Sequence, residues 1–286
     1  MKRIYSQSWT DYELIDAGNE RKLERWGNIV TIRPDRNAYF EPILSYNTWQ
    51  EQAHFEFIEN TKSSGIWNQL KPGFNKDWQI SIDELTINLH LTKFKHLGLF
   101  PEQKINWDYI AQNTNSGDKF LNLFAYTGVA SLIARQKGAD VFHCDSVKQV
   151  ISWGKENMLS SDLKDVHWIL EDALKFAQRE VRRGNKYQGI IMDPPAFGIG
   201  VNKQRWKIEN KFEELLQLAL KLREKTGYII INTYSPRLDT AKIEQIVNSL
   251  ILNEDYEIST LAVNSKTGKR LDYGQRTIIY CSISAL

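Results

Sequence analysis

The chain has 286 residues, of which 42% are hydrophobic and 25% are charged, values close to the averages of soluble globular proteins. They exclude a collagen-like chain and a wholly disordered one, and the length fits one large domain with a smaller attachment. Lys and Arg number 37 against 35 Asp and Glu, so the formal net charge is only +2. Any basic surface that binds nucleic acid must therefore be local.

The sequence lacks signals for a membrane, a leader or a metal. Its longest apolar stretches, such as Tyr228 to Ile231, are far shorter than the roughly 18 residues that span a bilayer. The N-terminal MKRIYSQSW has no apolar signal-peptide core, so we expect a cytoplasmic protein without membrane association. Cys144 and Cys281 lie in apolar strand-like runs, and two cysteines form neither a disulfide framework nor a four-thiolate zinc site. Five scattered histidines without an HExxH pair argue against a transition-metal centre.

Residues 1–110 are predicted to form a small β-rich domain with a possible role in substrate recognition. Alternating runs at Tyr12–Asp16, Ile29–Arg33 and Leu85–Leu91 are typical of strands. Six of the nine tryptophans fall here, and they are Trp9, Trp26, Trp49, Trp67, Trp78 and Trp107. Large rings can fill a thin core, so we favour packing; stacking of some of them on a ligand is the alternative. Polar composition around Gln112–Asp118 places the domain boundary near this segment.

Residues 111–286 alternate strand-like and helical patterns. The strand-like runs are Lys119–Tyr126, Asp140–Asp145, Val166–Asp172, Tyr187–Pro194 and Gly227–Ser235. The helical patterns are Gly128–Lys137, Val147–Leu159, Ala173–Arg183, Arg205–Lys225 and Thr240–Asn253. The tail has strand-like runs at Tyr256–Val263 and Arg276–Ser284, joined by the polar segment Asn264–Gln275, which predicts a hairpin. The expected fold is therefore α/β: a doubly wound, mostly parallel sheet with one antiparallel strand in the C-terminal hairpin.

Ligands of an open parallel sheet bind beyond the carboxyl ends of the strands, near the point where strand order reverses. After the first predicted strand, Ala125-Tyr126-Thr127-Gly128 turns into a helix whose free N–H groups can bind an acidic or polar ligand group. The turn has one glycine where GxGxxG has three, and the Walker pattern is absent. A loop with a single glycine is a poor cradle for a pyrophosphate, which disfavours NAD and FAD, and with them a nucleotide oxidoreductase.

Three further strand ends carry polar chemistry. Asp145 is placed to accept both hydroxyls of a ribose, and Asp172 to bind an adenine amino group, although each could instead cap the following helix. The fourth strand ends in Asp193-Pro194-Pro195-Ala196-Phe197. Two prolines fix an extended backbone, so the carbonyl groups of Asp193 and Pro194 are expected to point above the sheet, where a planar base could be held. The alternative is a simple strand terminator.

Together, FLNLFAYTG at 120–128, Asp145, Glu171-Asp172 and DPPAF at 193–197 resemble the class I S-adenosylmethionine-dependent methyltransferases. The NLFAYTG and DPPxF segments are similar to those of the bacterial large-subunit (23S) rRNA methyltransferase group, and the resemblance covers roughly residues 90 to 284. It implies a Rossmann-like methyltransferase sheet and S-adenosylmethionine as cofactor.

The resemblance also implies roles for individual residues. Those implied at the methionine end of the cofactor are Asn122, Phe124, Ala125, Tyr126, Thr127 and Gly128. Asp145 would bind the ribose, and Asp172 with Ala173 the adenine. Phe100 and Gln103 belong to a segment, residues 95–103, that would close over the cofactor or else only connect the domains. The implied meeting point of cofactor and target base is formed by Asp193, Pro194, Pro195 and Phe197.

The sequence departs from the group in ways that bear on the acceptor atom. Members that methylate carbon 5 of cytosine need a thiolate to activate the ring, and neither DPPAF nor the segment Asn232–Arg237 after the fifth strand contains a cysteine. Amino-group methylation comes with an aromatic residue directly after the second proline, where this chain has Ala196 and only then Phe197. A ring nitrogen such as guanine N7 attacks a sulfonium methyl directly once it is aligned and shielded from water. We expect a base nitrogen as acceptor and leave open which one.

Local charge favours RNA, in particular ribosomal RNA, as the substrate. Two basic segments are expected around one mouth, and their cations are Lys203, Arg205, Lys207, Lys211, Lys266, Lys269, Arg270 and Arg276. We select Lys203, Arg205, Lys207, Lys269 and Arg270 as substrate contacts, with Trp206 or Phe197 stacking an exposed base and Tyr234 as a further candidate. An ordinary solvated surface is the alternative interpretation of these cations. Near-neutral net charge keeps open a small-molecule or protein substrate, and a noncatalytic RNA-binding domain is the second rival.

Overall fold

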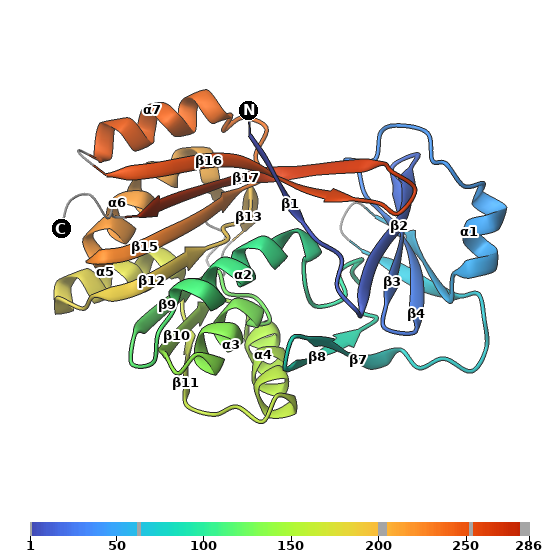
Figure 1. Ribbon diagram of the computed structural model, residues 1–286, viewed down its shortest axis with the longest axis horizontal. Coiled ribbons are helices and arrows are strands. Elements are labelled where there is room, and N and C mark those ends of the chain that lie inside the picture. The colour runs from blue at the N-terminus through green and yellow to red at the C-terminus, as the bar shows by residue number, and fades with distance from the viewer. Residues whose placement is uncertain (1, 62–63, 200–204, 252–253, 281–286) are drawn as a thin grey trace.

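The computed structural model describes residues 2–61, 64–199, 205–251 and 254–280. One side of the molecule is an eight-stranded sheet in the order β1-β16-β17-β15-β12-β9-β10-β11 (Figure 1). The strands are β1 (Arg3–Ser6), β9 (Lys119–Leu123), β10 (Asp140–Asp145), β11 (Val166–Leu170), β12 (Tyr187–Met192), β15 (Arg223–Thr233), β16 (Asp255–Asn264) and β17 (Arg270–Tyr280). All neighbours pair in parallel except β17, which is antiparallel to β15 and to β16. The predicted single antiparallel strand is confirmed.

Helices cover both faces of this sheet. One face packs on α2 (Lys104–Asn113), α3 (Val129–Gln136) and α4 (Lys148–Ser160), and the other packs on α5 (Ala173–Arg183), α6 (Phe212–Leu222) and α7 (Thr240–Leu250). Alternate residues of a strand serve the two sides: Phe120 and Ile191 join the core under α3, whereas Leu121 and Met192 join the core under α6. Both sets are buried, which is why the central strands are apolar almost throughout.

The strand order reverses between β9 and β12. The chain builds β9, β10 and β11 outward in one direction and then returns to place β12 on the other side of β9. Met192 is in register with Leu123, and the Asp193 N–H donates to the Leu123 carbonyl at 3.3 Å. The loops that follow these two strands therefore leave the sheet side by side. The predicted doubly wound α/β fold is confirmed.

The predicted helix over Arg205–Lys225 is wrong at both ends. Arg205–Lys207 is a short strand, β14, antiparallel to β13 (Phe197–Ile199), and the 3₁₀ turn Ile208–Asn210 precedes α6. Trp206 Nε1 donates to the Pro195 carbonyl at 2.6 Å, and the Ile208 N–H donates to the Ala196 carbonyl at 3.2 Å. These bonds tie the segment to the DPPAF loop, so the helix begins only at Phe212.

The other side of the molecule is a five-stranded sheet. It runs in the order β2 (Tyr12–Gly18), β3 (Arg21–Trp26), β4 (Ile29–Pro34), β5 (Phe55–Glu59) and β6 (Gly65–Gln69), with α1 (Tyr46–Gln52) beside it. A separate hairpin, β7 (Asp77–Ile82) and β8 (Leu85–His90), contacts α4. The predicted β-rich character of this part is confirmed. The division into residues 1–110 and 111–286 stays a prediction; β1 belongs to the eight-stranded sheet, and residue 110 lies inside α2.

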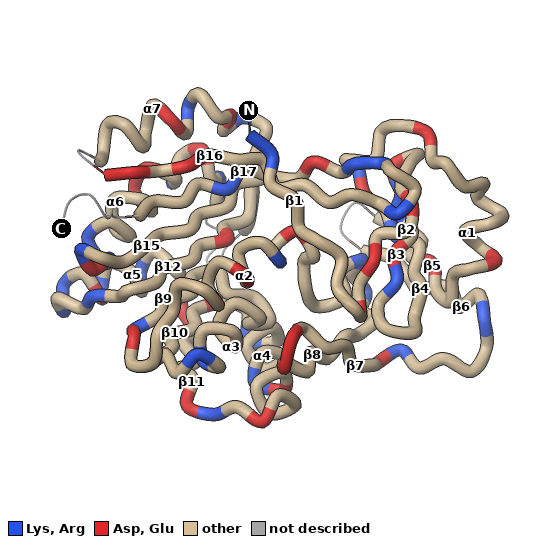
Figure 2. The backbone as a smooth tube through the Cα atoms, in the orientation of Figure 1, with Lys and Arg blue, Asp and Glu red and all other residues tan. Residues whose placement is uncertain are grey.

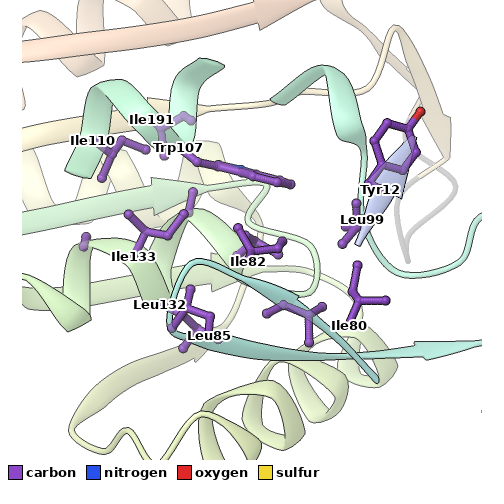
Figure 3. Close-up of a cluster of buried hydrophobic side chains, with 14 of the residues drawn as sticks. Tyr12, Ile80, Ile82, Leu85, Leu99, Trp107, Ile110, Leu132, Ile133 and Ile191 are labelled. Atoms are coloured by element: carbon purple, nitrogen blue, oxygen red, sulfur yellow. The ribbon is translucent and has the colours of Figure 1, made fainter. Parts of the chain in front are cut away.

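One hydrophobic cluster joins the two parts (Figure 3). Ile80 and Ile82 of β7 share this cluster with Trp107 and Ile110 of α2 and with Leu132 of α3, and Ile82 lies beneath the Trp107 ring. Trp26 and Trp49 are at most 2% exposed, which confirms for them the packing interpretation. Trp107 is 4% exposed and packs in the same cluster, but it also lines a small cavity described below. The remaining tryptophans of this part are half-buried against the same cluster, and they are Trp9, Trp67 and Trp78.

The β16–β17 hairpin extends beyond its own sheet and reaches the five-stranded one (Figure 1). At its tip, Lys266 N–H donates to the Leu14 carbonyl at 2.8 Å, and Thr267 Oγ1 donates to the Asp16 carboxylate at 2.6 Å. Its second strand begins at Arg270, six residues before the predicted Arg276, because the strand continues as an arm across the domain junction. Positions 281–284 of the predicted strand lie outside the described residues. In the described ranges, no helix is both long enough and apolar enough to cross a membrane.

Candidate active site

The loop between β9 and α3 has an unusual backbone. Phe124, Tyr126 and Gly128 have φ angles of 57°, 51° and 89°, in the left-handed region that costs a non-glycine residue about 1–3 kcal/mol. Neighbouring groups hold this shape: the Ala125 N–H donates to the Cys144 carbonyl at 3.1 Å, and Asn157 Nδ2 donates to the Thr127 carbonyl at 3.0 Å. Such strain persists only where the surroundings enforce it, and it is typical of ligand sites.

Asp145, at the end of β10, fixes the same loop. Its carboxylate accepts hydrogen bonds from the Tyr126 N–H at 3.0 Å and from the Val147 N–H at the start of α4 at 2.9 Å. Burial raises the pKa of this carboxyl, and the backbone N–H groups oppose the shift because they stabilise the charged form. Val147 is the N-cap residue of α4, so Asp145 does not occupy the cap position that one interpretation of the sequence gave it. Its carboxylate bonds the N–H of that cap residue and also lines a cavity.

That main cavity has a volume of about 440 Å³, within the range of ligand pockets. Its walls come from five segments, and the lining residues are Phe100, Glu102, Phe124, Tyr126, Asp145, Ser146, Val147, Val150, Asp193, Pro194, Pro195 and Tyr234. An inner cavity of about 50 Å³ shares Phe100, Phe124, Tyr126 and Asp193 and adds Thr127, Gly128 and the first turn of α3. The LFAYTG turn and the twin prolines therefore border the same space.

Asp193 is the acid at the centre of this space. Its Oδ1 is buried and has no hydrogen-bond partner within residues 2–61, 64–199, 205–251 and 254–280. Burial raises the pKa of Asp193 to about 6, against hydrogen bonds from the Tyr234 hydroxyl and the Asn232 amide. At neutral pH the carboxylate is mostly ionised, so it offers a free acceptor oxygen to an N–H donor.

A buried amide network holds the partners of Asp193. Gln103 Oε1 accepts from Asn106 Nδ2 at 2.7 Å and from Asn232 Nδ2 at 3.2 Å, and Gln103 Nε2 donates to the Tyr234 hydroxyl at 2.7 Å. Asn106 and Asn232 are completely buried. Residues before and within α2 therefore position Asn232 at the end of β15 and Tyr234 just after it, and Gln103 also lines the inner cavity.

Sequence reasoning missed Glu102 and the start of α4. Glu102 is 5% exposed, and burial raises its pKa to about 7. The sequence did contain a signal for Glu102, because it lies between Phe100 and Gln103, which were both predicted to close over the cofactor. Val147 and Val150 line the cavity one turn after Asp145, and their apolar spacing beside a strand-end acid could have indicated them.

Several predicted residues lie outside both cavities. Asp172 is exposed and accepts from the Lys175 N–H at 3.0 Å, so it caps α5, and Ala173 is buried behind it. Both follow β11, next to Asp145, whose carbonyl accepts from the Glu171 N–H at 3.1 Å. Asn122, in contrast, lines the inner cavity. Its side-chain amide already donates a hydrogen bond within the protein, to Ser131 Oγ at 2.9 Å. Binding of adenine by Asp172 and Ala173 stays a prediction.

The residues selected near DPPAF lie beside the main cavity. Phe197 is 55% exposed on β13, and Arg205 and Lys207 flank Trp206 on β14. The Trp206 ring contacts Phe124 with centroids 5.1 Å apart, so it supports the cavity wall from behind. Lys203 lies outside the described residues.

The structure separates the two basic segments that were expected at one mouth. Lys269 lies at the hairpin tip with Nζ 5.3 Å from the centre of the Phe40 ring, and Arg270 pairs with Asp272 at 2.9 Å. Arg276 is buried and pairs with Glu257 at 3.2 Å. Figure 2 shows basic and acidic residues interspersed over both parts of the molecule. Phosphate binding by Lys269 and Arg270 stays a prediction.

Cys144 is fully buried behind the site. Its Sγ lies 3.5 Å from the Glu171 carbonyl, and burial raises the pKa of the thiol well above its ordinary value. It lines neither cavity. Cys281 lies outside the described residues. In the part of the chain that the structure describes, no three His, Cys, Asp or Glu side chains gather as a metal site.

The cavity fits a nucleoside that carries a charged tail. Phe100, Tyr126 and Val147 supply apolar walls for a base, and Asp145 supplies a carboxylate for sugar hydroxyls. The first turn of α3 borders the inner cavity, where its free N–H groups suit a carboxylate. S-adenosylmethionine has this combination of groups.

Comparisons with known proteins agree with this geometry. A family model for S-adenosylmethionine-dependent methyltransferases matches residues 54–228. The SAM-dependent methyltransferase from Agrobacterium tumefaciens is 30% identical with a TM-score of 0.92, covering 99% of this chain and 94% of that one. The protein SMU.776, solved with SAH, is 16% identical with a TM-score of 0.76, covering 96% of this chain and 76% of that one. At this identity, the likeness to SMU.776 supports the fold of this chain and nothing more.

A curated relative, ribosomal RNA large subunit methyltransferase K/L of Pseudoalteromonas atlantica, is 31% identical over 166 residues. The match covers 55% of this chain and 23% of the relative, so the chain matches about a quarter of that protein's length. The predicted resemblance and the predicted cofactor are confirmed by the family model and by the Agrobacterium structure. The chain belongs to the S-adenosylmethionine-dependent methyltransferases.

Proposed function

We propose that the protein transfers a methyl group from S-adenosylmethionine to a nitrogen of an RNA base, with ribosomal RNA as the substrate. The observation that carries the proposal is the unpartnered Oδ1 of Asp193, buried in the cavity wall beside the twin prolines. A nucleobase has N–H donors that match this acceptor, and Pro194 and Pro195 present a rigid apolar edge for its ring. The ribosomal RNA methyltransferase named among the relatives supports the substrate class.

Different residues of the site would bind different parts of the cofactor and of the target base. Asp145 would hold the ribose of the cofactor, and the 124–128 loop with the α3 N-terminus would hold its methionine end. Asp193 and the Pro194 carbonyl would orient the target base. When bound, the cofactor supplies an electrophilic methyl group on its sulfonium. The protein then contributes alignment and exclusion of water, because a base nitrogen needs no covalent activation.

Thiol chemistry has no support at this site. Methylation of cytosine carbon 5 requires a thiolate against the ring, whereas Cys144 is buried, protonated and outside both cavities. Among residues 2–61, 64–199, 205–251 and 254–280 it is the single cysteine. A base nitrogen can accept the methyl group without a thiolate, so we propose nitrogen as the acceptor.

The test is methyl transfer to RNA from a strain that lacks the gene. Purified protein and isotope-labelled S-adenosylmethionine are incubated with that RNA, which is digested to nucleosides for mass spectrometry. We expect one N-methylated nucleoside from the wild type and a loss of about 10²–10³ in kcat for Asp193→Asn, which replaces the charged acceptor. Asp239→Asn is the matched control, because Asp239 caps α7 and lines neither cavity. Label in small molecules or proteins and none in RNA would reject RNA as the substrate.

A further inference from the structure

A second, narrower groove adjoins the main cavity. It has a volume of about 180 Å³ and lies between strands β3 and β4, the segment before α2, and the extended arm of β17. Phe100 and Glu102 line both spaces, so the groove and the main cavity share a wall. Its other polar lining residues are Lys22, Arg33, Asp35, Asn37, Lys95, His96 and Tyr273.

Two of the acids near this groove, Glu24 and Asp35, are already paired. Glu24, completely buried, accepts from Arg33 at 2.6 Å and from Tyr12 at 3.0 Å and lies 3.2 Å from Lys22 Nζ. Asp35 lies 3.1 Å from the same Lys22 Nζ, and it accepts from the Tyr273 hydroxyl at 3.0 Å. Lys22 and Arg33 therefore balance Glu24 and Asp35, and this four-residue cluster carries no net charge.

Lys95 is the surplus cation. Its half-buried ammonium donates to the Pro34 carbonyl at 3.3 Å, and it has no acidic partner among the described residues. Burial lowers the pKa of Lys95; Lys22 and Arg33 add to the shift, and Asp35 and Glu59 oppose it. Glu102, in the shared wall, has a pKa of about 7 and is only partly ionised at neutral pH. An anion in the groove would remove this imbalance.

The position of Lys95 is rigidly set. Arg33 Nη1 donates to the Lys95 carbonyl at 2.8 Å, while the guanidinium of Arg33 is itself bonded to Glu24. Lys95 is therefore held at the domain junction, and it lines a groove that adjoins the main cavity. This differs from an ordinary exposed lysine such as Lys93, two positions earlier, whose ammonium lies 5.3 Å from the centre of the Phe94 ring.

We propose that this groove binds a backbone phosphate of the RNA strand, next to the nucleotide whose base enters the main cavity, with Lys95 as its principal cation. The proposal rests on the proposed function and refines it. It assigns to the junction between the five-stranded sheet and the catalytic side a role in substrate positioning, which neither part fulfils alone.

The experiment measures binding of an RNA oligonucleotide substrate to the full chain by fluorescence anisotropy over a range of salt concentrations. Wild type, Lys95→Gln, Lys95→Arg and the control Lys93→Gln are compared, and calorimetry of S-adenosylhomocysteine checks that each variant is folded. We expect Lys95→Gln to bind RNA about tenfold more weakly, with the slope of log K against log salt smaller by about 0.7–0.9, the loss of one phosphate contact. Lys95→Arg should keep most of the affinity, and Lys93→Gln should match the wild type.

Two results would overturn the proposal. In one, Lys95→Gln and Lys93→Gln give the same affinity and the same salt slope as the wild type. In the other, inorganic phosphate or a nucleoside monophosphate binds in a Lys95-dependent way while RNA binding does not depend on Lys95, so the groove serves a small phosphorylated ligand. Both differ from failure of the proposed function, in which no RNA is methylated by the wild type.

Discussion

Asp145 lies where two backbone segments meet, and this position sets its expected energetic role. Its two oxygens bond the N–H groups of Tyr126 and Val147, so the carboxylate keeps the left-handed loop and the start of α4 in place before any ligand binds. A ribose diol would use the remaining lone pairs of the same oxygens. Preorganisation and ligand contact therefore come from one side chain.

We expect Asp145→Ala to weaken S-adenosylmethionine binding by about 1–3 kcal/mol, because the ribose hydroxyls lose a charged acceptor. Calorimetry of the cofactor measures this. Asp239→Ala removes a comparable helix-cap bond, to the Lys242 N–H at 3.0 Å, without touching either cavity, and it should leave the affinity unchanged. Equal affinities for Asp145→Ala and the wild type would remove Asp145 from the binding site.

Glu102 should make the folded protein less stable as pH rises, whereas an acid in a salt bridge makes it more stable. Its folded pKa, about 7, lies above the ordinary 4.5, so the folded state binds more protons between these values and stability falls as pH rises through that window. Above pH 7 we expect Glu102→Gln to be more stable than the wild type by about 1–3 kcal/mol, and below pH 4.5 the difference should vanish. Urea unfolding at several pH values measures it. A constant difference across the window would show that Glu102 titrates normally.

At the scale of elements, the sequence predicted the regular strands and helices of the parallel sheet better than the irregular segments between them. The Asp140–Asp145 strand and the Ala173–Arg183 helix have the predicted bounds, because the apolar spacing of each element directly reflects its burial. The helix predicted for the segment after DPPAF was wrong at its start. Arg205–Lys207 instead pairs with Phe197–Ile199, through contacts that no local periodicity shows. At the site, Asp145 and Asp193 line the main cavity at the strand ends, whereas Asp172, predicted in the same way, lies outside it. The approach of Glu102 depends on how the segment before α2 packs across the sheet, which no local pattern shows.

The hairpin arm depends on one buried acid that joins three elements. Asp16 of β2 is completely buried, and its carboxylate accepts from the Leu44 N–H at 2.7 Å, Trp49 Nε1 at 3.1 Å and Thr267 Oγ1 at 2.6 Å. It therefore connects the strand, the α1 region and the hairpin tip. All of these partners are neutral donors; the Trp49 donor is buried, and the Leu44 and Thr267 donors are partly buried.

We expect Asp16→Ala to lower the free energy of unfolding by about 3–5 kcal/mol, because several buried and partly buried donors lose their acceptor together. Thr267→Val removes only the bond to the hairpin tip and should cost about 1 kcal/mol. Chemical unfolding followed by tryptophan fluorescence compares the two. If both variants lose the same small amount, Asp16 does not join the elements energetically.

At the scale of the whole molecule, the two parts share their support. β1, from the N-terminal end, pairs with β16, α2 packs on α3, and the hairpin arm returns to β2. Residues before position 111 also complete the site, since Gln103 holds Asn232 and Tyr234. The β-rich part is therefore structural for the methyltransferase sheet as well as a candidate for substrate contact.

This sharing predicts that residues 111–286 alone will not fold to a binding-competent state. The fragment lacks Trp107 and Ile110, which are nearly fully buried and each stabilise the core by about 1.5–3 kcal/mol, and it lacks β1 and the Gln103 network. That loss is a large share of a typical total stability of about 5–15 kcal/mol. Circular dichroism melting and calorimetry with S-adenosylmethionine compare the fragment with the full chain. We expect a broad or absent transition and no cofactor binding, whereas a sharp transition with full-chain affinity would establish 111–286 as an independent domain.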